Sequence, residues 1–312
     1  MAHLSDDRGQ MLLIGGLAIA VAFVALALIL NSSVYIENVA NRENVVVGEE
    51  GVTVYQDDVR RGVGRAVTAG NANGSSPADR KSDINEGVET LASALRDYHA
   101  ERGRAVDVAV DSHSVGTRVF RPDEGEFTEP NGTDDDWTVG SNTRFRRFGM
   151  NVTRSNLSSG ALADVFRIRI DDGSTARKVY VFKNTTGPDK TVVRTRNVDT
   201  GALSAPCVDA TGSTTVINLT AGEVSGEHCE ALDFFESVDP SYTLAFRNGG
   251  STNVTGRYDF VVNESNPSPD YGSDGEITTR KVVYSTRVKA VYYAPDVKYV
   301  AKLRVAPGEP DA

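Results

Sequence analysis

The chain has few of the side chains that metal sites require. It contains two cysteines and four histidines in 312 residues. No two histidines stand four residues apart, so the zinc-binding helix of metalloproteases is absent. His228 beside Cys229 lacks a convincing second pair of ligands. We therefore predict no metal and no cofactor, and we expect His3, His99 and His113 at the surface.

The common catalytic motifs are missing as well. The sequence has no Gly-X-X-X-X-Gly-Lys-Ser/Thr phosphate loop and no nucleophile elbow. The run Asp134-Asp135-Asp136 lacks the spaced ligands and turn glycine of a defined calcium loop, so a solvated acidic turn is favoured over a calcium site. These absences predict a protein that is not an enzyme.

Positive charge is scarce. The 33 basic and 43 acidic residues give a formal net charge of −10, and only eight of the basic residues are Lys. Such a surface repels nucleic acid, and no basic cluster that would bind phosphate groups is apparent in the sequence, so we predict no nucleic-acid partner. An acidic, Lys-poor composition favours a high-salt habitat, with an ordinary acidic secreted protein as the alternative.

One long hydrophobic run stands out in this polar chain. Met11–Leu30 holds twenty residues without a charge, among them six Leu, three Ile, two Val and one Phe. A helix of about 20 apolar residues spans the hydrocarbon core of a bilayer. A cleaved secretory signal fits less well, because its apolar region is shorter. We therefore expect an N-terminal transmembrane helix and a membrane partner.

The residues before this run resemble a known processing site. Arg8, Gly9 and Gln10 directly precede the hydrophobic segment, an arrangement similar to that of archaeal type IV prepilins, in particular haloarchaeal pilin-like proteins, and of Tad-type pilus-assembly proteins. The resemblance covers the first 30 to 45 residues and implies cleavage after Gly9. Many pilins have Glu at the fifth residue after the cut, whereas this chain has Ile14.

Small residues on the same run favour close helix packing. Gly15, Ala18, Ala22 and Ala25 make one shallow face, although Ala and Gly are common in membrane spans. The expected partners are other pilin-like or envelope proteins, contacted through this N-terminal helix.

Sequons and cysteines indicate the compartment. Nine Asn-X-Ser/Thr motifs lie beyond Leu30; Asn31 is expected to be unmodified, and the candidate glycosylation sites are Asn73, Asn131, Asn151, Asn156, Asn184, Asn218, Asn253 and Asn263. We predict a single-pass protein with a cytoplasmic N-terminus and an extracellular C-terminal domain. Cys207 and Cys229 are expected to form a disulfide there, with free thiols as the alternative.

Helices are expected before strands. Val52–Ala69 has apolar residues at spacings of three and four, and Ile84, Val88, Leu91, Leu95 and Tyr98 share one helix face, with Ser82 or Asp83 as its cap. From Ala105 the apolar period becomes two. Expected strands are Val106–Val110, Val115–Arg121, Arg144–Val152, Val165–Ile170, Val179–Phe182, Thr191–Arg196, Thr214–Leu219, Tyr242–Arg247, Arg257–Val262, Arg280–Tyr293 and Val297–Val305.

These patterns predict an α+β protein: an N-terminal transmembrane helix, a short helical region, and a mainly antiparallel, β-sandwich-like extracellular head. The expected segments are a leader at 1–9, the transmembrane helix and its extension at 10–47, a helical region at 48–104, the β-rich domain at 105–306 and a frayed tail at 307–312. The last two strands, joined by a turn at Ala294-Pro295-Asp296, are expected to form a central hairpin of the core, with a contact surface as the alternative.

The expected function is that of a pilin-like surface protein with a structural or interaction role in a cell-envelope or pilus-type assembly. The alternative is a stand-alone, membrane-anchored extracellular binding domain.

Overall fold

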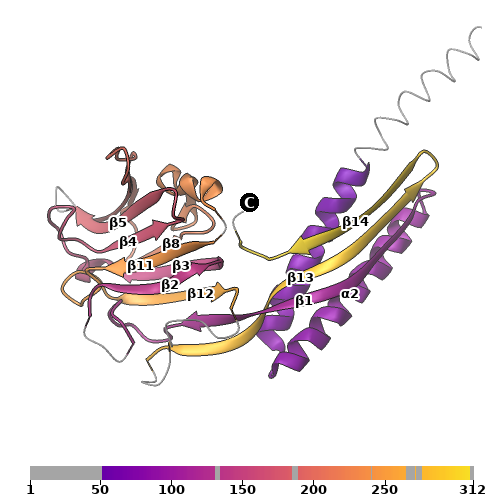
Figure 1. The fold of residues 1–312 in the computed structure, drawn as a ribbon, viewed down its shortest axis with the longest axis horizontal. Coiled ribbons are helices and arrows are strands. Elements are labelled where there is room, and N and C mark those ends of the chain that lie inside the picture. The colour runs from indigo at the N-terminus through magenta and orange to yellow at the C-terminus, as the bar shows by residue number, and fades with distance from the viewer. Residues whose placement is uncertain are drawn as a thin grey trace, which may run out of the picture.

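The computed structural model describes residues 51–130, 134–184, 189–239, 241–264, 271 and 276–309. The described chain is elongated, with a β-sandwich at one end and two helices at the other (Figure 1). The helices are residues 51–73 and α2 (Pro77–Ala100). The longer strands are β1 (Ala105–Phe120), β2 (Trp137–Thr143), β3 (Phe145–Thr153), β4 (Arg167–Asp171), β5 (Ala176–Asn184), β6 (Lys190–Asn197), β8 (Thr214–Asn218), β11 (Tyr242–Arg247), β12 (Gly256–Val262), β13 (Thr278–Ala294) and β14 (Val297–Val305). The short elements are η1 (Arg154–Asn156), β7 (Cys207–Asp209), β9 (Glu223–Val224), β10 (Glu227–His228) and η2 (Glu230–Ser237).

The strands form two antiparallel sheets, as the sequence predicts. One sheet has the order β10-β9-β8-β3-β12-β1-β13-β14, and the other has the order β2-β11-β4-β5-β6-β7. Alternating inward residues of both sheets meet in a core rich in aromatic rings, where Phe148 and Phe260 stack with centroids 4.9 Å apart. The predicted β-sandwich head is therefore confirmed.

Two strands run the length of the molecule. β1 and β13 pair from Ala105 and Tyr293 at the helical end to Phe120 and Thr278 in the sandwich, with bulges near Ser112 and Val115. Beyond the sandwich, β1, β13 and β14 form a three-stranded extension of the large sheet, and the two helices lie on one face of it (Figure 1). We call this extension and its two helices the stalk, and the β-sandwich the head.

The stalk helices bury the faces that their sequences predict. In the first helix Tyr55, Val59, Val63 and Val67 recur every four residues, and all four are fully buried. Gly62 allows close packing, because a Cβ there would lie 2.5 Å from the side chain of Leu91. These residues join Ile84, Val88 and strand residues such as Val108, Ala290 and Tyr292 in a second hydrophobic core.

α2 starts earlier than expected. Its cap is Ser76 rather than Ser82 or Asp83: the Ser76 side chain accepts a hydrogen bond from the Asp79 amide, and the Asp79 carboxylate accepts one from the Ser76 amide. Pro77 stands in the first turn, where its missing N–H costs nothing. On the predicted apolar face, Tyr98 is exposed, and Ala92 and His99 are buried instead.

The expected membrane topology requires correction. Over the residues that the structure describes, no helix combines the length and the apolar character needed to cross a membrane. The described helices are amphipathic, with cations such as Arg60, Arg61 and Arg65 along the first. This finding overturns the expected fold class in its transmembrane part and the single-pass location; the observed fold is predominantly antiparallel β-sheet with two helices packed on it. The expected span Met11–Leu30 itself lies outside the described residues.

The C-terminal hairpin forms with its predicted turn, but it is not central. β13 ends at Ala294 and β14 begins at Val297. β14 is the last strand of the large sheet, so this hairpin lies at the edge. The adjoining residues Pro307–Glu309 are held by hydrogen bonds and ion pairs described below, and are not frayed.

Candidate functional site

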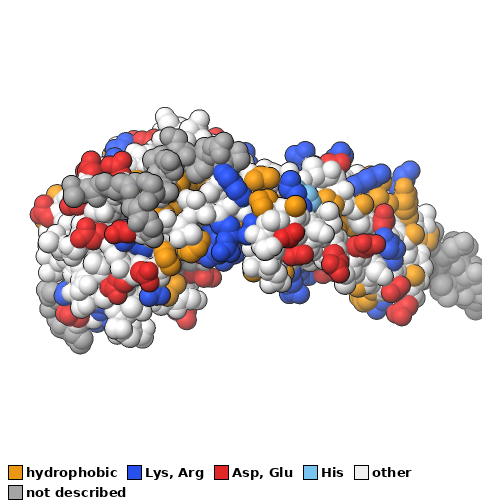
Figure 2. All heavy atoms as spheres, turned by 90° about the horizontal axis from the view of Figure 1, so that it is seen from below, with side chains coloured by type: hydrophobic (Ala, Val, Ile, Leu, Met, Phe, Trp, Pro, Cys, Tyr) orange, Lys and Arg blue, Asp and Glu red, His pale blue; other side chains and the backbone are white. Residues whose placement is uncertain are grey.

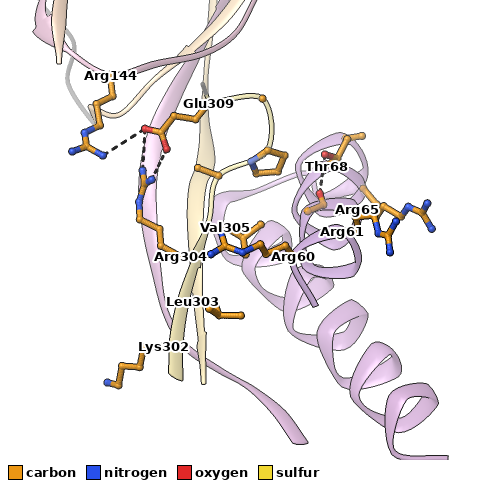
Figure 3. A pocket seen from close by; sticks show the side chains of 16 residues that line it. Arg60, Arg61, Arg65, Thr68, Arg144, Lys302, Leu303, Arg304, Val305 and Glu309 are labelled. Carbon is orange, nitrogen blue, oxygen red and sulfur yellow. Dashed lines mark hydrogen bonds and ion pairs between the residues drawn. The ribbon is translucent and has the colours of Figure 1, made fainter. Parts of the chain in front are cut away.

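A basic groove lies between the first helix, β14 and the residues that follow β14. Its volume is about 1050 Å³. Its floor includes apolar groups such as Gly64, Leu303 and Val305. The described residues that line it include six cations from three separate parts of the chain: Arg60, Arg61 and Arg65 from the helix, Arg144 from the head, and Lys302 and Arg304 from β14. Figure 3 shows the side chains of Arg61 and Arg65 directed away from β14, and those of Lys302 and Arg304 directed away from the helix.

Helical periodicity keeps the arginines out of the stalk core. Val59, Val63 and Val67 pack into the stalk core, so the residues next to them in sequence lie at the margin of the buried face or in solvent. Arg61 pairs with Asp58 at 2.7 Å. Arg60 and Arg65 are exposed, and neither forms an ion pair within the described part of the chain.

Among the described residues, Glu309 is the one acidic residue that lines the groove. Its carboxylate pairs with Arg304 and, at 3.7 Å, with Arg144, and it accepts a hydrogen bond from the Tyr284 hydroxyl at 3.0 Å. Its side chain is only 9% exposed. The carboxylate is therefore used in fixing the chain after β14, and it cancels only part of the positive charge of the groove.

A buried arginine anchors the same segment. Arg146 donates hydrogen bonds to the carbonyls of Pro307 (2.9 Å) and Val283 (2.8 Å). Burial lowers the pKa of the Arg146 guanidinium to about 10, so it remains charged at neutral pH. Burial and the Glu309 carboxylate raise the pKa of the Tyr284 phenol, which keeps that group neutral. These contacts hold one end of the groove rigid.

The face of the stalk sheet opposite the helices is also basic. Exposed residues of β13 and β14 alternate along the strands, with Lys302 opposite Lys289 and the apolar Val300 opposite Val291. Val300 is 47% exposed, and Lys298 lies over the ring of Tyr293, which is itself exposed. Two ion pairs, Lys302 with Asp111 and Arg96 with Asp107, lie at the β1 side.

The groove and this sheet face together form one cationic surface around β14. Figure 2 shows another face, on which acidic side chains are spread over both the head and the stalk, while basic side chains gather where the two meet. Exposed cations bind carboxylates or other anions. Exposed apolar groups beside them can pack against an apolar group of the same partner. The arrangement is suited to recognition of an acidic partner, and the prediction that nucleic acid is not a partner stays a prediction.

The predicted disulfide is present. Cys207 and Cys229 are bonded, with their Cα atoms 5.8 Å apart. The bond joins β7 of the small sheet to the residue that precedes η2, and Cys229 belongs to the head core. His228 is exposed and lies 3.4 Å from Asp233. Because Cys229 is in the disulfide, this pair of residues forms no zinc half-site.

A buried polar network lies close to this disulfide. The Arg154 guanidinium pairs with Asp209 at 3.1 Å and donates hydrogen bonds to the carbonyls of Thr211 and Gly212. Burial would raise the pKa of Asp209, but hydrogen bonds from Thr215, Thr211 and Ser225 outweigh it and lower the pKa to about 2. The network is satisfied by the protein itself, which indicates a structural role.

The other predicted sites are dispersed. Asn73, Asn151, Asn156 and Asn184 are exposed, whereas Asn218, Asn253 and Asn263 are half-buried; Asn131 lies outside the described residues. Gly149 and Asn218 are cross-strand partners, so Asn218 lies near Asn151 on the outer face of the large sheet. The sequence alone gave no reason to expect two sequons on one sheet face.

The acidic turn is used locally. Asp134 accepts a hydrogen bond from the Asp136 amide, and Asp136 accepts one from the Asn248 amide. In the described residues, no three His, Cys, Asp or Glu side chains are grouped as metal ligands.

The predicted processing and helix-packing residues lie outside the described part of the chain. They are Arg8, Gly9, Gln10, Gly15, Ala18, Ala22 and Ala25.

Two of the three histidines expected at the surface are in contact with other elements. His99 is buried among the rings of Tyr55, Tyr98 and Tyr292. His113 is half-buried and its two ring nitrogens lie 3.0 Å from Thr286 and from Asn85. His3 lies outside the described residues.

Comparison with known proteins gives one partial match. A family model described as a family of unknown function (DUF7261) matches residues 5–121, which include the first helix, α2 and β1. Neither the curated proteins nor the solved structures contain a match.

Proposed function

We propose that this protein is a pilin-like structural or interaction protein, which uses the cationic stalk to dock an acidic partner. The observation that carries the proposal is the concentration of six cationic side chains around one groove in a chain of net charge −10. Opposite charge across an interface steers association and selects partners. The groove is open, and its fixed margin at Glu309 keeps two of the cations in place.

The architecture supports a structural role. β1 and β13 belong to both the stalk and the head, so the helices are connected to the sandwich through continuous strands rather than through a flexible linker. An elongated subunit of this kind presents a head at a fixed distance from whatever the stalk contacts. The disulfide supports an oxidising compartment.

The pilin-like part of the proposal rests on the resemblance at Arg8, Gly9 and Gln10. It predicts that the recovered protein begins at Gln10, which mass spectrometry of N-terminal peptides measures directly. Gly9→Val should block the cut, whereas Leu13→Ala, a change beyond the site, should leave it intact. A wild-type protein that begins at Met1 or Ala2 would remove the pilin-like reading.

A second candidate function is a stand-alone binding protein. The same groove favours it, because an anionic ligand could be held there without assembly into a larger structure. Chemical cross-linking of the full chain at increasing concentration separates the two. A ladder of covalent multimers that is lost in Arg60→Glu/Arg65→Glu supports a subunit of an assembly, whereas a monomer at every concentration supports the binding protein.

A further inference from the structure

β14 has an unpaired edge within the described structure. It pairs with β13 in an unbroken register from Ala294 and Val297 to Thr286 and Val305, and it is the terminal strand of its sheet. The hairpin turn has two residues, so the pair that closes it is hydrogen-bonded, and alternate residues beyond it direct their N–H and C=O groups away from β13. These residues include Lys298, Val300 and Lys302.

Cations border this edge on both sides. On the outer sheet face, Lys298 and Lys302 flank Val300, and Lys289 lies opposite Lys302. On the helix side, Arg60 and Arg65 line the groove that β14 closes. Two β14 strands paired side by side would therefore bring like charges together, which opposes edge-to-edge association of identical strands.

We propose that the edge of β14 binds an acidic, extended polypeptide segment as an additional strand of the large sheet. Its main chain would pair with the outward N–H and C=O groups of β14. On the outer face, its side chains would follow the order acidic, apolar, acidic, opposite Lys302, Val300 and Lys298. Carboxylates on its other face would meet Arg60 and Arg65.

A polypeptide is favoured over other anions by two features. An edge strand offers regularly spaced backbone donors and acceptors, which only another extended chain matches in full. The exposed Val300 between two lysines provides an apolar position that a uniformly charged polymer leaves unfilled. The inference rests on the proposed docking role but not on its pilin-like form.

The test measures binding of a synthetic peptide to the full chain. The probe is an end-capped peptide that carries Glu on both strand faces around a central Val, and the control replaces every Glu by Gln. Isothermal titration calorimetry at low and at molar salt should show binding of the Glu peptide, weakened but retained at high salt, because screening acts on the charges and not on the backbone pairing. No binding of the Glu peptide would overturn the proposal.

Protein variants separate charge from strand addition. Arg60→Glu/Arg65→Glu should weaken binding by about ten-fold, through the loss of exposed ion pairs and the repulsion that replaces them. Val300→Pro removes one outward N–H and leaves the β13 ladder intact, so it should also weaken binding by about ten-fold. Arg257→Glu on the head is the matched control and should bind as wild type does.

A peptide variant keeps the test independent of protein folding. Methylation of every interior backbone nitrogen in the Glu peptide leaves its charge unchanged and removes the N–H donors of both edges, so the peptide cannot pair as a strand. If the methylated peptide does not bind while the unmethylated Glu peptide does, the proposal is supported. Equal binding of the methylated peptide, or of dextran sulfate, would show a non-specific anion surface and overturn it. Dimerisation of the wild-type chain that Val300→Pro abolishes would identify a second copy as the occupant, which also overturns it.

Discussion

The head and the stalk contain two hydrophobic cores of different construction. The head core is enclosed between two sheets and is dominated by aromatic rings such as Phe127, Phe148 and Phe246. The stalk core is mainly Val, between two helices and one face of a three-stranded sheet. The head is closed on both faces, whereas the stalk leaves a sheet face and the β14 edge without a described covering. Under the proposed function, recognition belongs to the stalk, where the sheet face and the β14 edge are open.

The largest expected effect tests whether the two cores unfold separately. Phe148→Ala should destabilise the head by about 4 kcal/mol, because it opens a cavity in a close-packed core. Ile84→Ala should destabilise the stalk by about 3 kcal/mol. The fluorescence of Trp137, which is buried in the head core, reports on the head, and far-ultraviolet circular dichroism reports on the helices.

In urea, Phe148→Ala should shift the Trp137 transition, and Ile84→Ala should shift mainly the helical one. If Ile84→Ala moves both transitions equally, the continuous strands β1 and β13 couple the two cores into one unit, and the distinction between them fails as a statement about stability.

A smaller effect is expected from pH in the head. Asp209 has a pKa lowered to about 2 in the folded protein by its hydrogen bonds, against 3.8 ordinarily. A carboxyl group whose pKa is lower in the folded protein stabilises the fold at any pH above its ordinary pKa, and this stabilisation is lost as the pH falls through the pKa of the folded state. For Asp209 the loss in the free energy of unfolding is roughly 2 kcal/mol between pH 4 and pH 2. Asp209→Asn should be less stable at neutral pH and should lose less on acidification. Urea midpoints at a series of pH values measure this, and parallel curves for the two proteins would contradict it.

The smallest effect concerns the stalk. Burial lowers the pKa of His99, and so does Arg104, while Asp58 acts in the opposite direction. Both ring nitrogens of His99 are buried without a hydrogen-bond partner in the described structure. Below the ordinary pKa of 6.5 the unfolded chain takes up a proton that the folded stalk excludes, so stalk stability should fall as pH drops from there.

His99→Leu should remove this dependence and leave the pH response of the head unchanged. Helical circular dichroism between pH 7 and pH 5 provides the measurement. A wild-type stalk whose stability is constant over this range would show that His99 is hydrated or paired in solution.

Local patterns in the sequence were sufficient for much of the fold. The period of four in Tyr55, Val59 and Val63 and the alternation from Val106 onward correctly placed the stalk helix and β1. The short strand β7 and the strand β2, with its glycine and polar residues, were missed because their pairing depends on distant partners. The turn at Pro295 was evident from the sequence. Whether its hairpin lies at the centre or at the edge of the sheet depends on long-range strand pairing, which local patterns do not reveal.

The candidate site was much less predictable. Its cations come from residues 60–65, Arg144 and residues 302–304, which are far apart in sequence, so no basic run marks them. Buried positions of His99 and Arg146 likewise follow from tertiary packing, which overrides the usual surface preference of these residues. The disulfide was predictable because the chain has only one possible pair.

Hydrogen–deuterium exchange tests most directly whether recognition belongs to the stalk. The full chain is compared with and without the Glu-containing peptide at saturating concentration. The account predicts slower exchange of the outward amides of Val300 and Lys302, with the head strands β4, β5 and β11 unchanged. If peptide binding slows amide exchange only in the head, or does not slow it in β14 at all, the account is contradicted.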